Sequence, residues 1–69
     1  MNICFDGFIF SYQQYGGISV HFASLISELL KRDFRIFLLV TKKQYKNLLN
    51  NIHLKSLIGH INFIFLKNN

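Results

Sequence analysis

Two adjacent glycines stand just before the first helical pattern of the chain, in a position suited to binding an anion. Gly16 and Gly17 follow a polar, aromatic-rich stretch, and an apolar helical pattern begins at Ile18. The amino end of a helix presents unpaired backbone N–H groups and the positive end of the helix dipole, and both favour a negative charge. Because glycine has no Cβ, the backbone there can approach a phosphate closely. Ser19 can cap the helix or offer its hydroxyl to the same anion.

The glycine pair alone leaves two interpretations open. Neither of the standard phosphate-binding fingerprints, G-x-G-x-x-G and G-x-x-x-x-G-K-[S/T], occurs in the chain. A plain turn capped by Ser19 explains the same residues as well as an anion site does.

Other residues that could do chemistry are few. Asp6 ends the first predicted strand, where a site residue of an α/β protein would lie, but a simple turn residue is an equally good interpretation. His21 is favoured as a surface or capping histidine over a general base. His53 and His60 have no carboxylate near them in the sequence, which argues against a metal site. There is no paired-carboxylate or Ser-His-Asp arrangement for acid–base or nucleophilic catalysis.

The lone cysteine is expected to be structural. Because Cys4 is the only cysteine, it has no disulfide partner within the chain, and a C-x-x-C metal site is excluded. It lies in a short apolar run without clean alternation, which predicts a strand buried on both faces of a parallel sheet. We therefore expect Cys4 to be a small buried residue.

Strand and helix patterns alternate along the chain. Helix 18–31 has apolar residues at three- and four-residue steps, and Thr41 and Gln44 have the spacing of a capping box at the start of the second helix. This β-α-β-α-β order predicts an α/β fold with a parallel sheet and right-handed crossovers, as at the start of a Rossmann-like domain. The predicted elements are strand 2–5, helix 18–31, strand 34–40, a helix from Thr41, an ambiguous helix tail or loop over 53–60 with a stop at Gly59, and strand 61–66.

Length and charge restrict the class of protein. The chain has 69 residues, 51% of them apolar, and no proline, which predicts one small ordered domain. The net charge is +5, and from Phe34 onward there are six bases and no acid. A basic half can bind nucleic acid, an anionic membrane surface or a phosphate-bearing ligand, but a solvated face is favoured because the lysines are scattered. The lack of a signal-peptide pattern or a spanning segment predicts a cytoplasmic location.

The first 32 residues resemble the opening of family 4 glycosyltransferases of the GT-B fold, the group 1 glycosyltransferases. Many members begin with a short strand ending in Asp-Gly, followed by an "IFSLQ-x-x-GGISRYF" segment and a helix. This chain departs from the pattern at Val20 and His21, where many relatives have Arg-Tyr. The matching residues are Asp6-Gly7, Ile9-Phe10-Ser11, Gln13, Tyr15-Gly16-Gly17-Ile18-Ser19 and Phe22.

The resemblance implies two Rossmann-like domains with the active site between them. The enzymes transfer a sugar from a nucleotide-sugar donor to a glycan or lipid-linked acceptor with retention of configuration, generally without a metal, and no cofactor is implied beyond the donor substrate. The donor diphosphate would be approached by Gly16, Gly17, Ile18 and Ser19. The acceptor side would include Asp6, Tyr15 and His21.

The resemblance also implies that residues 1–69 form only part of the N-terminal domain, without the second domain. We therefore expect an inactive piece of a glycosyltransferase, located in the cytoplasm or at the inner face of the membrane through a peripheral contact. The alternative is a free-standing basic module that binds a phosphate, a nucleotide or a nucleic acid, with nucleic acid the less favoured partner because no RNP-like motif is present.

Overall fold

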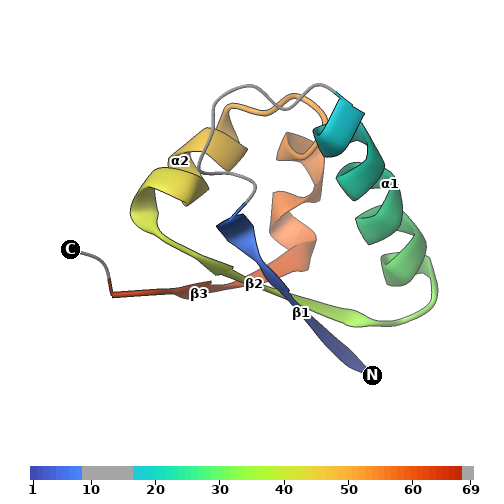
Figure 1. Ribbon diagram of the computed structural model, residues 1–69. Helices are drawn as coiled ribbons and strands as arrows, with labels where there is room; N and C mark the ends of the chain where they lie inside the picture. Colours follow the sequence, from blue (N-terminus) through green and yellow to red (C-terminus); the bar gives the residue numbers. More distant parts are fainter. Residues whose placement is uncertain (9–16, 68–69) are drawn as a thin grey trace.

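Three parallel strands and the helices that cover one of their faces form the α/β fold (Figure 1). This computed structural model describes residues 1–8 and 17–67, and of residues 17–19 only the backbone. The predicted order of strands and helices is confirmed. The elements are β1 (Asn2–Asp6), α1 (Gly17–Lys31), β2 (Arg35–Val40), α2 (Lys42–Leu49), the 3-10 helix η2 (Lys55–His60) and β3 (Ile61–Phe65).

The sheet has the order β1-β2-β3, and both pairs of neighbours are parallel, as predicted. Cys4 lies beside Phe37 of β2, and Phe37 lies beside Asn62 of β3. Hydrogen bonds extend the ladder at both ends of β2, from Arg35 N to Met1 O at 2.8 Å and from Leu66 N to Val40 O at 2.8 Å. The central strand is therefore paired along its whole length.

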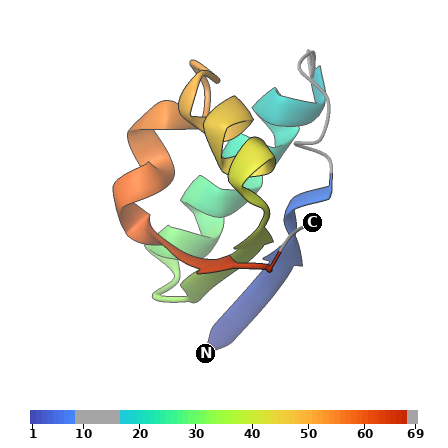
Figure 2. The same ribbon diagram turned by 90° about the vertical axis from the view of Figure 1, so that its left-hand side faces the viewer.

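All the helices lie on the same side of the sheet (Figures 1 and 2). Alternate residues of β2 point toward them and are fully buried, because side chains of a strand alternate between its faces. Phe5 and Phe22 meet edge to face, with ring centroids 5.2 Å apart, and join β1 to α1. The buried core consists of Ile26, Ile36, Leu38, Val40, Leu48, Leu54 and Ile61.

Among the residues that the structure describes, no helix lies over the opposite face of the sheet, which corrects two predictions. Burial in β1 alternates, with Ile3 and Phe5 half-buried and the residues between them exposed, so β1 is not buried on both faces. Cys4 points to the uncovered face and is exposed. The short apolar run has the composition of a doubly covered strand, but the described residues cover only one side of it.

Helix α1 ends in a Schellman motif. Phe34 N donates to Leu29 O at 3.1 Å and Asp33 N donates to Leu30 O at 3.1 Å, while Asp33 has a φ of 64°. These are the two hydrogen bonds of that motif, and the left-handed residue is usually glycine. Leu25, which the spacing assigns to the apolar face of this helix, is 45% exposed. The face that packs on the core is therefore narrower than predicted.

Helix α2 begins with the predicted capping box, which is confirmed. Gln44 N donates to Thr41 Oγ1 at 3.2 Å, and Thr41 N donates to Gln44 Oε1 at 2.9 Å. Two backbone N–H groups at the start of the helix are thereby satisfied. The ambiguous segment over 53–60 ends in the two-turn 3-10 helix η2. Leu54, the residue before η2, is fully buried in the core, and η2 contacts both α2 and β3.

Candidate functional site

The candidate site lies at the edge of the sheet where the strands end. Asp6 ends β1 and is aligned with Leu39 near the end of β2. The next element after β1 is α1, which begins at Gly17, and the next after β2 is α2, which begins after Thr41. Ligands of open α/β sheets bind at this carboxyl edge, outside the strands.

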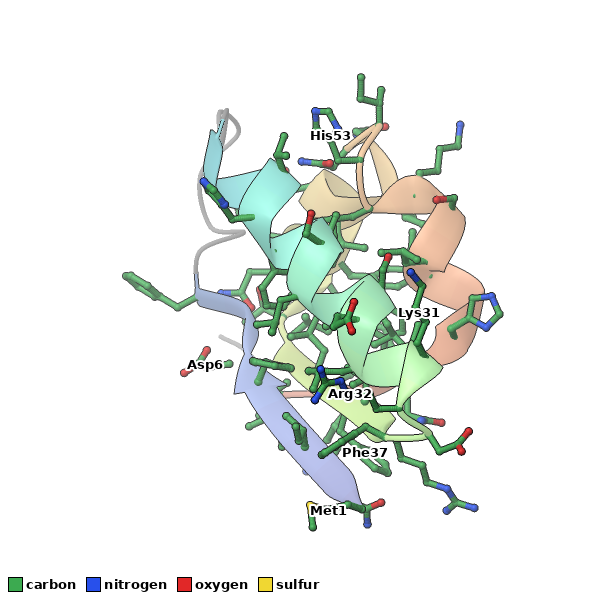
Figure 3. All side chains as sticks on the ribbon, turned by 90° about the vertical axis from the view of Figure 1, so that its right-hand side faces the viewer. Met1, Asp6, Lys31, Arg32, Phe37 and His53 are labelled. Carbon is green, nitrogen blue, oxygen red and sulfur yellow. The ribbon has the colours of Figure 1, made fainter. Side chains whose placement is uncertain are left out.

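Asp6 is exposed, and half of its carboxylate already has a structural role. Its Oδ1 accepts a hydrogen bond from the backbone N–H of Phe8 at 2.9 Å, which forms an Asx turn. Figure 3 shows the Asp6 side chain projecting from β1 on the side away from the helices. The turn interpretation of this residue is thus supported by a contact, and its other carboxylate oxygen faces outward.

Gly7 is held against the end of β2 and the start of α2. A Cβ at this position would lie 2.7 Å from Leu39 O, 2.8 Å from Val40 Cγ1 and 3.3 Å from Gln44 Oε1. Only glycine permits this approach without displacing backbone. Gln44 is buried, with 8% of its surface exposed, although it is polar. The segment that leaves β1 therefore begins in contact with Gln44 of the α2 capping box.

The sequence does not reveal this contact of Gly7. Its signal in the chain is only a turn dipeptide, Asp6-Gly7, whereas the contacting residues are more than thirty positions away. The capping box did mark Gln44 as special, but gave no indication that Gly7 lies against it. A long-range approach of backbone to backbone leaves no periodic pattern in one sequence.

The glycine pair falls at the start of α1, since the helix begins at Gly17. Gly16 and Tyr15, predicted on the donor and acceptor sides respectively, lie outside the described residues. Ile18 and Ser19 lie in the first turn of the helix. Ser19 therefore lies inside the helix and does not precede it, so of the two roles considered for Ser19 the capping role does not fit a helix that begins two residues earlier.

His21 is on the surface of α1, where its side chain is exposed. The neighbouring Phe22 packs on Phe5 of β1, so the first turns of α1 lie over the end of that strand. The structure thus brings the start of α1 toward β1 through an apolar contact. No described contact joins His21 to Asp6, the other residue predicted on the acceptor side.

The described strands contain no reversal of strand order, the place where a ligand crevice opens in a doubly wound sheet. The three strands follow one another in a single direction across the sheet, with their helices on one face, and β1 is an edge strand. In doubly wound sheets the crevice opens where the strand order reverses. Such a reversal would lie beyond β1, so a complete crevice needs structure on the far side of that strand.

Within residues 1–8 and 17–67, no group of three His, Cys, Asp or Glu side chains is arranged to hold a metal ion. Among the helices that the structure describes, none has the length and apolar character needed to cross a membrane.

Comparisons with known proteins give no assignment: no family model, no curated protein and no solved structure matches this chain.

Proposed function

We propose that this chain is the N-terminal piece of a retaining glycosyltransferase that uses a nucleotide-sugar donor. The observation that carries the proposal is the place of its two sequence motifs in the fold. Asp6-Gly7 falls at the end of the first parallel strand, and Gly17 of the glycine pair is the first residue of α1. That is the arrangement that the resemblance to family 4 glycosyltransferases requires.

The backbone N–H groups at the start of α1 would face the donor diphosphate in this proposal. The dipole and the unpaired N–H groups of a helix start favour an anion, and the described first turn contains no acidic residue that would oppose it. Gly17 has no side chain to keep a phosphate away. Asp6, at the adjacent strand end, would lie on the acceptor side.

The piece should be inactive by itself because one wall of the crevice is not enough to hold a donor. We expect the purified chain to transfer no sugar from a panel of UDP-, GDP- and ADP-sugars to glycan and lipid-linked acceptors, as followed by mass spectrometry of the products. Turnover by these 69 residues would contradict the inactive-piece proposal.

The DNA downstream of the coding sequence tests the same proposal at the gene level. DNA downstream of the coding sequence should encode, in frame or frameshifted, a second Rossmann-like domain. Co-expression of that segment with this chain should then yield transfer. Absence of any such coding segment, together with no transfer, would contradict the glycosyltransferase assignment.

Gly17 provides a residue-level test in the completed enzyme. Gly17→Val would place a branched side chain against the diphosphate, so we expect turnover at sub-saturating donor to fall at least about tenfold through a higher KM. Gly59→Val is a matched control, since nothing lies within 4 Å of a Cβ at Gly59. Unchanged turnover for Gly17→Val would reduce Gly17 to a turn residue.

A basic binding module is the second candidate, and the surface of α2 favours it. Lys42, Lys43 and Lys46 are all exposed, and α2 contains no acid. Within the described residues the ion pair that is present joins Arg32 to Glu28 on α1, away from these lysines. Binding to RNA or DNA that weakens steeply with salt, and that Lys42→Glu/Lys43→Glu removes, would favour this function over the first.

A further inference from the structure

The uncovered face of the sheet carries apolar side chains at its centre and a charged side chain toward either end. We define the open face as the strand residues that point away from the helices. Its centre is Phe37, half-buried between its neighbours and flanked by exposed Cys4 (Figure 3). The open face consists of Asn2, Cys4 and Asp6 of β1, Arg35, Phe37 and Leu39 of β2, and Asn62 and Ile64 of β3.

Parallel strands are stable when both faces are covered, because their central strands are apolar on both sides. Phe37 and Leu39 on the open face of β2 are as apolar as the buried residues of its other face. Ile64 beside Leu39 is 44% exposed. An occupant that covers these side chains would remove their remaining exposed apolar area from water.

Two opposite charges mark the two ends of this face. Arg35 begins β2 and Asp6 ends the neighbouring β1, and both side chains belong to the open face by register. Arg35 is exposed and Asp6 has a carboxylate oxygen that the Phe8 turn does not use. One end of the open face is therefore positively charged and the other end negatively charged, and an occupant must present the opposite charges at the two ends.

A second copy of the chain matches that polarity by symmetry. A two-fold axis that crosses the strands at the level of Cys4, Phe37 and Asn62 would place each strand antiparallel to its own copy. Since Asp6 and Asn2 are equally far from Cys4 along β1 and Asn2 is aligned with Arg35, this rotation brings Asp6 of one copy over Asn2 and beside Arg35 of the other. Two identical ion pairs then form, one on each side of the axis, as an isologous interface requires.

The charges also reject the other face-to-face arrangement. A two-fold axis along the strands would stack the two copies in parallel, with Arg35 against Arg35 at one end and no partner for Asp6. Like charges in contact at an interface cost free energy, and opposite charges fix its orientation. The antiparallel arrangement is therefore the one that the open face selects.

We propose that the open face of the sheet is the contact surface between two copies of this chain, which pack with their strands antiparallel about that axis. The inference does not depend on the proposed glycosyltransferase function. In this dimer Phe37 of each copy lies at the centre, and Arg35 and Asp6 of opposite copies pair at the ends.

Cys4 reports on this arrangement because it is the only cysteine of the chain and lies next to the axis. The two thiols face each other across stacked sheets, which are separated by about 10 Å. A bismaleimide of matching reach should convert the protein to a covalent dimer within minutes at micromolar concentration. The Cys4→Ser protein, treated in the same way, gives the background.

Sedimentation equilibrium between low micromolar and millimolar concentration tests the dimer itself. We expect a reversible monomer–dimer equilibrium for the native chain and a loss on the order of 100-fold in affinity for Phe37→Asp, which places a charge at the centre of the interface. Ile52→Asp is the matched control, because Ile52 is 81% exposed but lies outside the open face. This control should dimerise like the native chain.

The charge pair gives a test that does not depend on the core of the interface. Arg35→Glu and Asp6→Lys should each weaken the dimer at least about tenfold, and the double variant should recover most of the native affinity. Both positions are exposed, but Asp6→Lys also removes the hydrogen bond from Phe8 N, so circular dichroism of each variant checks that it is folded. A native chain that stays monomeric at millimolar concentration, no covalent capture through Cys4, or a double variant as weak as the single ones would each overturn the proposal.

Discussion

At the scale of single residues, Gly7 is a position that leaves no room for a side chain. Gly7→Ala would put a Cβ 2.7 Å from a backbone oxygen of β2 and 2.8 Å from Val40 Cγ1, so the turn must shift. We expect a loss of about 1–3 kcal/mol in the free energy of unfolding, measured by urea denaturation followed by circular dichroism. Gly59→Ala, with open space around the new methyl, should change it by no more than ~0.5 kcal/mol. Equal effects of the two changes would contradict this account of Gly7.

Asp33 is a residue where a substitution should stabilise the protein. It occupies the left-handed position of the Schellman motif with a φ of 64°, where a Cβ is unfavourable. We expect Asp33→Gly to raise the free energy of unfolding by about 0.5–1 kcal/mol in the same urea assay. Asp33→Ala keeps the Cβ and should be less stable than the glycine variant. The opposite ranking of the two variants would contradict the strain at this residue.

At the scale of elements, α2 depends on its cap, because eight residues are too few for a stable isolated helix. Thr41→Ala removes the oxygen that accepts from Gln44 N and leaves that N–H without its partner. We expect a loss of about 1 kcal/mol in the free energy of unfolding, with Thr41→Ser close to the native value. A hydroxyl variant as unstable as the alanine variant would show that the cap contributes nothing.

The elements themselves could be predicted because their signals are local. Spacing of apolar residues marked α1, and the four residues from Thr41 marked the start of α2. The 3-10 helix η2 could be predicted only as an ambiguous helix tail or loop: Leu54, Leu57 and Ile58 have helical spacing, but the segment is too short for that spacing to separate a helix from a loop. The candidate site was predicted only as far as the strand end at Asp6 and the helix start at Gly17. The close approach of Gly7 depends on distant backbone, which no local pattern encodes.

At the scale of the whole molecule, the fold is one layer of helices on a sheet whose other layer is absent from the described residues. The burial of Cys4 was predicted wrongly for this reason, since an apolar strand segment does not say how many of its faces are covered. A sheet with one covered face buries little area, so the isolated chain should have only marginal stability. The same feature leaves the proposed glycosyltransferase crevice incomplete and provides the surface for the proposed dimer.

Stability should therefore depend on protein concentration. If only the folded chain dimerises, mass action raises the unfolding temperature as concentration increases. We expect Tm of the native chain to rise by several degrees between about 5 µM and 500 µM, as measured by calorimetry, because 1 kcal/mol shifts Tm by ~4–8 °C in a domain of this size. Phe37→Asp should have a Tm that does not change with concentration, whereas Ile52→Asp should follow the native chain. A native Tm that is constant over this range would show that the open face remains in water when the chain is folded.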